Sequence, residues 1–401
     1  MLTHVHTLWI RRGFPHYGVS LSQIFLFLVQ HVKKFEVNPF YNVTYRTPVT
    51  SITSETRPLI TIDADASVLV AMEVLHANRV LAAPVFNPDN SCIGSIDVLS
   101  ILRYLFSVHV PSTSFSEFRE KVNDLHSLWR LLAHIPVRAV VTHPLCSHLT
   151  PFFQANPVSM LVDLMAASVH RVALFRADKE LIGQCSQTDL IRYLAALVTH
   201  SAPEFAPVVP LPGPLVALAQ QLKPADIAKI KDAARTPVAE LNLFRPAQSI
   251  SGQCSMLEAL YTLAADARRA VSVEDESGAM ICELSVSDLH LLSGASFADL
   301  RLSVSTWLTK HSQRALTPPC VRNDVAYGSV VMLLAVGGRH RLWVLDDAGK
   351  ATHVITNTDV LRAVGDRNAV DMRAVSGDTD IGALWRRTES NDDSLSGKFC
   401  F

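Results

Sequence analysis

One constellation of residues occurs twice in this chain at the same spacing. A His-Arg pair comes first, an aspartate follows the arginine by eighteen residues, and a hydroxyl residue lies three positions before the aspartate. The first copy consists of His170, Arg171, Ser186 and Asp189. The second copy consists of His340, Arg341, Thr356 and Asp359. A constellation that recurs at a fixed spacing indicates internal duplication of a structural unit.

The residue types of this constellation suit a phosphorylated sugar. One carboxylate can accept hydrogen bonds from both hydroxyl groups of a ribose. A Ser or Thr three residues earlier can cap a helix and also face a ligand, and the helix start attracts an anion. Arginine and histidine side chains supply donors for phosphates. A simple helix cap and a solvated strand edge are the alternatives for either copy alone, whereas two copies at one spacing favour binding.

Two further segments carry part of the constellation. Ser285 and Asp288 repeat the hydroxyl and the acid, and Arg268-Arg269 lies near the His-Arg position but out of step. We therefore include Ser285 and Asp288 as candidate binding residues. In the first segment the order is reversed, with Asp97 at the hydroxyl position and Ser100 at the acid position, so we do not expect the same manner of binding there.

All four segments alternate helical and strand-like patterns. Each has an apolar stretch of helical period, a β-rich run, a turn, a second strand, and a hydroxyl or acid residue that opens another helix. This alternation predicts an α/β fold. The expected divisions are an amino-terminal extension at 1–53, repeats at 54–110, 134–199, 237–297 and 298–368, a proline-rich linker at 200–236 and a disordered tail at 369–401.

The linker and the amino terminus have compositions of their own. Five prolines between positions 203 and 214 predict an extended chain in the first half of the linker. A short helix is expected over 225–234. Basic residues without an acidic residue before Glu36 leave an organelle transit peptide open as an alternative to a variable extension.

Composition and missing motifs exclude several classes of function. The formal net charge of −1 creates no field that would recruit nucleic acid or an anionic membrane. No apolar run reaches the about 20 residues that a membrane helix needs. The sequence has no GxSxG, P-loop, GxGxxG or HExxH motif and no Cys/His cluster at zinc spacing. We therefore expect no catalytic residue and no bound metal.

The strand pairs followed by Gly-h-h-Ser/Thr-x-x-Asp resemble the signature of cystathionine-β-synthase (CBS) repeats. The stretch from Gly183 to Asp189 matches it fully, and those that end at Asp288 and Asp359 match apart from the glycine. Four such repeats, with His-Arg in the second and fourth, resemble the gamma subunits of AMP-activated protein kinase. The resemblance covers about residues 54–366.

The resemblance implies two tandem CBS pairs (Bateman modules) that form a pseudo-symmetric disk. It implies a non-enzymatic regulatory subunit that senses AMP, ADP or ATP, in the cytoplasm or also the nucleus, with a kinase alpha subunit and a beta scaffold subunit as partners. The aspartates would hold riboses and the His-Arg pairs would hold phosphates. The first repeat departs from this family, because Leu81 stands where a phosphate-binding arginine is usual. The alternative function is a CBS scaffold that joins proteins without binding nucleotide.

Overall fold

The computed structural model describes residues 39–53, 59–78, 80–112, 114–122, 124–144, 150–177, 180–265, 269–312 and 318–365. Residues 1–38 of the expected extension and the expected tail at 369–401 lie outside this described part. Within it, four copies of one strand-helix-strand-strand-helix unit follow one another along the chain.

The four units use equivalent elements in the same order. Repeat 1 comprises β1 (Ile62–Asp63), α4 (Val68–Ala77), β2 (Ala82–Phe86), β3 (Cys92–Asp97) and α5 (Val98–Tyr104). Repeat 2 comprises β4 (Thr150–Phe153), α9 (Val158–Ala166), β5 (Arg171–Phe175), β6 (Leu181–Ser186) and α10 (Gln187–Ser201). Repeat 3 comprises β8 (Ser249–Ser251), α13 (Met256–Ala265), β9 (Ala270–Glu274), β10 (Met280–Ser285) and the 3-10 helix η5 (Val286–Leu291). Repeat 4 comprises β11 (Cys320–Val321), α16 (Tyr327–Gly337), β12 (Arg341–Leu345), β13 (Ala351–Thr356) and α17 (Asn357–Val364).

Shorter elements connect and flank the repeats. Before repeat 1 lie α3 (Pro39–Arg46) and η1 (Val49–Ser51). Repeat 1 is followed by a π-helical turn η2 (Leu105–His109), then α6 (Phe115–Lys121), α7 (Leu125–Leu131) and α8 (Val137–Val141). Between repeats 2 and 3 lie η3 (Pro203–Phe205), α11 (Gly213–Ala219), α12 (Pro224–Arg235), η4 (Val238–Leu241) and β7 (Arg245–Pro246). Between repeats 3 and 4 lie α14 (Gly294–Ala298) and α15 (Val304–His311).

Each sheet begins with a short strand that the sequence analysis did not anticipate. This leading strand pairs in parallel with the second strand, and the second pairs antiparallel with the third. Parallel neighbours need a crossover connection, which the first helix of the unit supplies. The leading strands are only two to four residues long, so they carry too little alternation to be recognised from sequence.

The hairpin registers align the four repeats residue by residue. The pairs that close each hairpin against the following helix are Ala82 and Asp97, Arg171 and Ser186, Ala270 and Ser285, and Arg341 and Thr356. Repeats 2 and 4 therefore begin their second strand with the arginine of the His-Arg pair. Repeats 1 and 3 have an alanine at that position.

The helices form two cores, and each core is shared by repeats that are not consecutive in sequence. Repeats 1 and 3 contribute to one buried cluster, which includes Leu99 and Leu260. Repeats 2 and 4 contribute to the other, which includes Leu194 and Leu361. Burying one leucine side chain contributes about 1.5–3 kcal/mol, so these clusters hold the non-consecutive repeats together.

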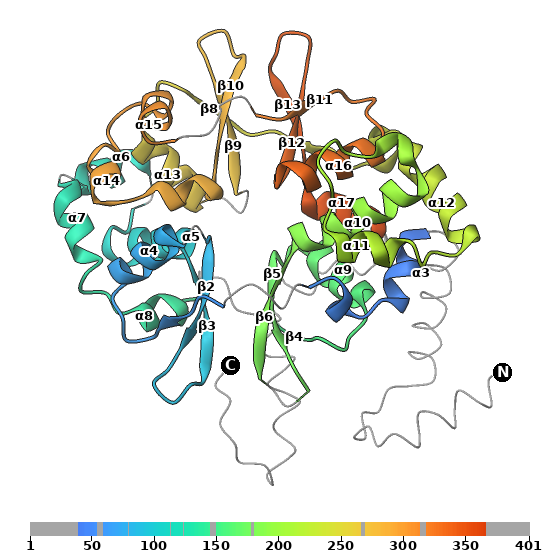
Figure 1. Ribbon diagram of the computed structural model, residues 1–401. Helices are drawn as coiled ribbons and strands as arrows, with labels where there is room; N and C mark the ends of the chain where they lie inside the picture. The colour runs from blue at the N-terminus through green and yellow to red at the C-terminus, as the bar shows by residue number, and fades with distance from the viewer. Residues whose placement is uncertain are drawn as a thin grey trace, which may run out of the picture.

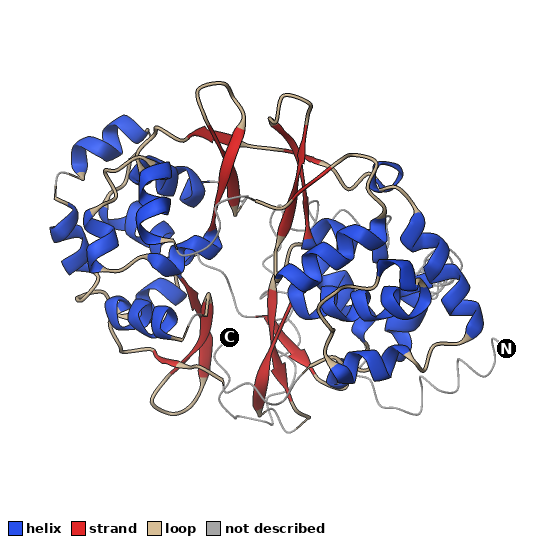
Figure 2. Cartoon of the chain, turned by 45° about the horizontal axis from the view of Figure 1, so that its top comes forward, coloured by secondary structure: helices blue, strands red, loops and turns tan. Residues whose placement is uncertain are grey.

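The sheets lie between the two helical cores. Figure 1 shows the sheet of repeat 1 beside that of repeat 2, and the sheet of repeat 3 beside that of repeat 4, with the helices on the outer left and right. Figure 2 shows the same arrangement from a second direction. The predicted fold of four α/β repeats, arranged as two tandem pairs around a centre, is confirmed.

The flanking segments are folded into the core of repeats 2 and 4. α3 packs on α9 and α12 packs on α16, and isolated bridges join Pro48 to Pro157 and Pro237 to Ala326. Residues 39–53, part of the expected extension, thus pack on repeat 2 as residues 224–241 pack on repeat 4.

The expectation of an extended chain in the first half of the linker is wrong in part. The short helix η3 starts at Pro203, and α11 starts at Gly213 with Pro214 in its first turn. A proline in the first turn of a helix lacks only an N–H that would have no intrahelical partner there. The expected helix over 225–234 is confirmed by α12, which is two residues longer.

Candidate functional site

The two His-Arg pairs lie at equivalent places and face a common centre. Each arginine is the first residue of a central strand, β5 or β12, and each histidine immediately precedes that strand. The charge of Arg171 acts on the ring of His340, and the ring of His340 acts on that of His170. The structure therefore brings His170, Arg171, His340 and Arg341 into one cluster, although 170 residues of sequence separate the pairs.

Arg269 is a further cation of this centre. The backbone N–H of the residue that follows the hydroxyl position donates to the carbonyl of His170 in repeat 2, of His340 in repeat 4 and of Arg269 in repeat 3. Arg269 therefore takes the place of the histidine. Its charge contributes to lowering the pKa of both His170 and His340.

Two carboxylates offset part of this positive charge. Glu283 on β10 lies 3.8 Å from Nη1 of Arg341 and accepts a hydrogen bond of 2.8 Å from Nε1 of Trp343. Asp97 at the end of β3 attracts both Arg171 and Arg269. Repeats 1 and 3 thus supply counter-charges to the arginines that repeats 2, 3 and 4 contribute.

Gln187 fixes the orientation of the His170 ring. Its amide nitrogen donates to the carbonyl of Met165 at 3.0 Å and to Oγ1 of Thr358 at 2.8 Å. Because a carbonyl can only accept, this end of the amide must be the NH₂ group. The other end, Oε1, lies 3.1 Å from Nδ1 of His170, so that nitrogen carries the hydrogen. Nε2 of the neutral ring is then the atom that gains a proton when the ring becomes charged.

Both central histidines are neutral at physiological pH in this structure. Burial lowers the pKa of His170 to about 4, and the charge of Arg269 adds to the shift. Burial likewise is the main reason that the pKa of His340 falls to about 4, and the charges of Arg341 and Arg171 lower it further. An anion placed among these groups would reverse the effect of the arginines and favour the protonated rings.

The three candidate aspartates all close a capping box with the preceding Ser or Thr. Oδ2 of Asp189 accepts from the backbone N–H of Ser186 at 2.9 Å and from its hydroxyl at 2.8 Å. Asp288 and Asp359 make the same two contacts with their own hydroxyl residues. Each box stabilises a helix start, so the capping alternative holds at all three positions and occupies one oxygen of each carboxylate.

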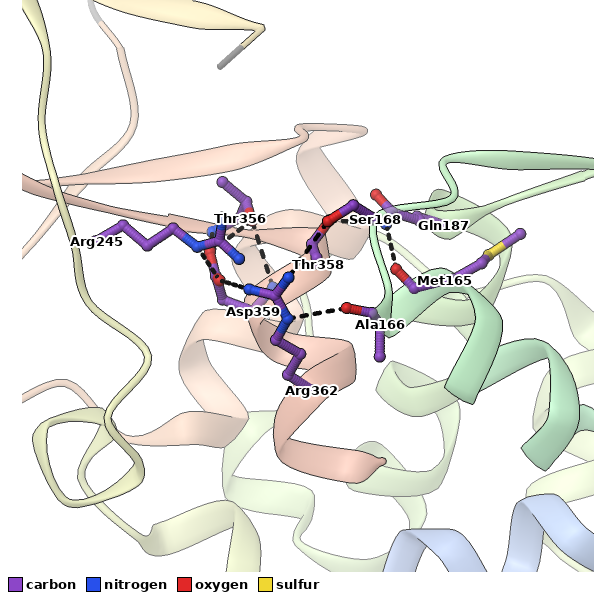
Figure 3. A network of polar contacts seen from close by, with 9 residues as sticks. All are labelled: Met165, Ala166, Ser168, Gln187, Arg245, Thr356, Thr358, Asp359 and Arg362. Atoms are coloured by element: carbon purple, nitrogen blue, oxygen red, sulfur yellow. Dashed lines mark hydrogen bonds and ion pairs between the residues drawn. The ribbon is translucent and has the colours of Figure 1, made fainter. Parts of the chain in front are cut away.

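The surroundings of the aspartates differ. The Asp189 side chain is 25 % exposed, and its Oδ1 lies 3.9 Å from Nη1 of Arg192. The Asp359 side chain is only 4 % exposed, and its Oδ1 pairs with Arg245 and with Arg362. Figure 3 shows Arg245 reaching this carboxylate from one side and Arg362 from the other. Asp288 is buried.

Repeat 1 lacks the constellation in space as it does in sequence. Leu81 and Ala82 occupy the His-Arg positions. Asp97 acts as the cap of α5 and accepts from the backbone N–H of Ser100 at 2.7 Å.

Sequence reasoning placed Arg269 out of step with the His-Arg pairs and left it out of the candidates, and it missed Gln187. Arg171 precedes Ser186 by fifteen residues, and Arg341 precedes Thr356 by the same number. The same count back from Ser285 reaches Ala270, which would have placed Arg269 beside the histidines. No comparable pattern marks Gln187, because its role depends on a contact with Thr358 in another repeat.

The described residues contain no group of three His, Cys, Asp or Glu side chains that could hold a metal ion. None of the helices among them is long and apolar enough to cross a membrane.

The comparisons show which class of proteins this chain resembles, namely proteins that contain CBS domains. The family model described as CBS domain matches residues 49–107. A solved structure of a protein from Methanocaldococcus jannaschii superimposes with a TM-score of 0.57 at 13 % identity, covering 79 % of this chain and 99 % of that one. At that identity, the likeness concerns the fold alone.

Within this class, the chain resembles the gamma subunits of AMP-activated protein kinase. It is 24 % identical to the "5'-AMP-activated protein kinase subunit gamma" of Kluyveromyces lactis over 318 residues, which cover 76 % of this chain and 85 % of the relative. It is 22 % identical to the subunit of the same name from Saccharomyces cerevisiae over 316 residues, which cover 76 % of this chain and 86 % of that relative.

Proposed function

We propose that this protein is a regulatory subunit of the gamma type, which binds AMP, ADP or ATP and reports their levels to an AMP-activated or SNF1-type protein kinase. The observation that carries the proposal is the convergence of His170, Arg171, Arg269, His340 and Arg341 from three repeats on one centre. Clustered cations of this kind suit the phosphates of a nucleotide, and arginine can bind a phosphate through two parallel hydrogen bonds.

The aspartate of the capping box would then hold the ribose. Asp189 fits this role best, because its Oδ2 is already held by Ser186 while its partly exposed Oδ1 lies beyond hydrogen-bond distance of Arg192. The capping box fixes the carboxylate before the ligand arrives, which lowers the entropic cost of binding.

The proposed role is regulatory rather than catalytic. A kinase alpha subunit and a beta scaffold subunit are the proposed partners, since the relatives from two yeasts are named as kinase gamma subunits. A nucleotide could change kinase activity only if it binds two states of the assembly with different affinity.

Calorimetry with AMP and with ATP tests nucleotide binding by the full chain. Arg171→Ala should lower the affinity by about tenfold to 100-fold, because hydrogen bonds to charged groups contribute about 1.5–3 kcal/mol. Arg176→Ala is the matched control, since Arg176 follows the far end of the same strand and pairs with Glu180 on the surface. Absence of binding heat in the wild-type protein, or equal affinities of the two variants, would contradict the proposal.

A scaffold function is the second candidate, and the loss of the constellation in repeat 1 favours it. A scaffold should retain kinase subunits in a pull-down whether or not nucleotide binds. The comparison therefore needs an Arg171→Ala variant that keeps its partners. If kinase activity in that complex no longer responds to AMP, the sensor proposal stands. If neither the variant nor the wild-type complex responds, the scaffold function is the better description.

A further inference from the structure

Repeat 4 has a strand that repeat 2 lacks among the described residues. β7 adds to β13 as a fourth strand of the repeat 4 sheet, with Arg245 opposite Val354. The corresponding sheet of repeat 2 has the three strands β4, β5 and β6. β7 belongs to the segment that follows the linker, so a residue from outside repeat 4 is brought to the start of α17.

That residue pairs with the candidate ribose-binding carboxylate. Nε of Arg245 donates to Oδ1 of Asp359, and Nη1 of Arg362 lies 3.5 Å from the same oxygen. Oδ2 accepts from the backbone N–H of Thr356 at 2.9 Å and from its hydroxyl at 2.6 Å. Both oxygens of this carboxylate are therefore engaged, which agrees with its 4 % exposure.

A ribose would have to displace a cation from this carboxylate. Two hydroxyl groups would replace the guanidinium group, and although their hydrogen bonds to the carboxylate are also charge-assisted, they supply no positive charge to offset the buried carboxylate. Release would also leave a guanidinium group in a partly buried place, where Nη2 of Arg245 already lacks a partner among the described residues. Such an exchange is unfavourable unless other contacts of the ligand with the protein compensate for it.

We propose that Arg245 closes the ribose site of repeat 4 from within, so that the intact constellation of repeat 4 does not hold a nucleotide while that of repeat 2 does. This inference rests on the proposed nucleotide-binding function. It assigns Arg245 as the residue that decides which of two sites with the same spacing of residues is open. It also predicts that the closure is removable by one substitution.

The test compares the number of AMP molecules bound per chain, by equilibrium dialysis of the full-length protein with labelled AMP. Arg245→Ala should bind one AMP more than the wild-type protein. The additional AMP should disappear in the double variant Arg245→Ala/Asp359→Asn. Arg322→Ala is the matched control, because Arg322 is an exposed arginine of the same repeat and is 84 % exposed; its stoichiometry should equal that of the wild type.

Folding is checked with a second variant, Arg245→Gln, which keeps the first part of the side chain and a polar end but removes the charge, and with circular dichroism of each protein. If both Arg245 variants fold and neither gains a site, the closure is wrong. If they bind less AMP than the wild type, Arg245 is a ligand-binding residue and the closure is also wrong.

The two proposals fail in different ways. Binding of AMP by the wild type with no gain in the Arg245 variants overturns the closure and leaves the sensor function intact. Binding that Asp189→Asn leaves unchanged and Asp359→Asn abolishes reverses the assignment of the open site. Absence of AMP binding in the wild type and in every variant overturns the sensor function itself.

Discussion

Repeats 2 and 4 carry the same constellation at the same spacing, but the amide side chain beside the central histidine is one methylene group shorter in repeat 4 than in repeat 2. Gln187 and Asn357 occupy equivalent positions after the hydroxyl residue. Gln187 reaches His170, Met165 and Thr358. Asn357 is 1 % exposed, and neither its Oδ1 nor its Nδ2 has a hydrogen-bond partner among the described residues. The shorter side chain leaves His340 without the support that His170 receives.

The aspartates differ in the opposite way to the histidines, because the aspartate of repeat 4 has more partners than that of repeat 2. Asp359 is engaged by two arginines and is almost inaccessible, whereas Asp189 keeps one oxygen near the surface. Repeat 2 thus has a fixed histidine and an open carboxylate, and repeat 4 has a less supported histidine and a closed carboxylate. Equal spacing in sequence therefore predicts equal placement of side chains but not equal chemistry, because the second partners come from other parts of the chain.

The largest difference between the repeats should appear in stability. Breaking a buried ion pair costs about 3–5 kcal/mol, and because Arg245 and Arg362 are each 36 % exposed, we expect Asp359→Ala to cost about 2–3 kcal/mol. Asp189→Ala should cost about 1 kcal/mol, as for the loss of a helix cap. Urea unfolding of the two variants beside the wild type measures both values. Equal losses would mean that the two aspartates are equivalent after all.

A smaller effect concerns the cation that repeat 3 contributes. Arg269→Ala should lower the affinity for AMP by about tenfold, as expected for one charged hydrogen bond. It should also raise the pKa of His170 more than that of His340, because Arg269 is the foremost charge acting on His170 and a minor one for His340. Titration of the histidine resonances by NMR measures the two pKa values. Arg176→Ala is a suitable control, since Arg176 pairs with Glu180 on the surface.

Much of the fold and part of the candidate site could be predicted from the sequence. The alternation of helical and strand patterns indicated the four α/β units, and the repeated spacing indicated both His-Arg pairs, because strand register and helix starts are local features that recur with the motif. The hydroxyl and acid residues were found for the same reason. The placement of Arg269 could also be predicted, because fifteen residues back from Ser285 lead to Ala270, the residue that follows Arg269.

The remaining features depend on contacts between distant segments. Arg245 meets Asp359 only because β7 joins the sheet of another repeat. Gln187 contacts Thr358 only because repeats 2 and 4 share a core. The leading strands are too short to show a period. A local pattern cannot report such partners, since their position is decided by how whole repeats pack.

A matched pair of substitutions tests the amide side chain that makes the surroundings of the two histidines different. Gln187→Leu should destabilise the protein by about 1 kcal/mol or more, because it leaves Oγ1 of Thr358 and Nδ1 of His170 without the partner that Gln187 provides. Asn357→Leu should be neutral or stabilising, because it removes two buried polar atoms that lack partners among the described residues and keeps the branched shape of the side chain. Thermal or urea unfolding compares them. A loss of similar size for Asn357→Leu would show that Asn357 has a structural role equal to that of Gln187.

The smallest expected effect is the pH dependence of nucleotide binding, and it distinguishes the histidines. Both rings are neutral in the unliganded protein, with a pKa of about 4, and a bound phosphate raises that pKa. Binding therefore takes up protons at pH values between the free and bound pKa, so the affinity rises as the pH falls. Between pH 7.5 and 5.5 we expect a gain of about threefold.

Calorimetry in two buffers of different ionisation enthalpy counts the protons taken up, and the variants His170→Gln and His340→Gln assign them. Nucleotide phosphates titrate near pH 6 themselves, and the double histidine variant measures that background because it keeps the ligand unchanged. His170→Gln should remove more of the uptake than His340→Gln. Oε1 of Gln187 accepts from Nδ1 of His170 and so stabilises the charged ring, whereas Asn357 gives His340 no such contact. Equal contributions from the two rings would mean that the amide of Gln187 positions His170 without influencing its protonation.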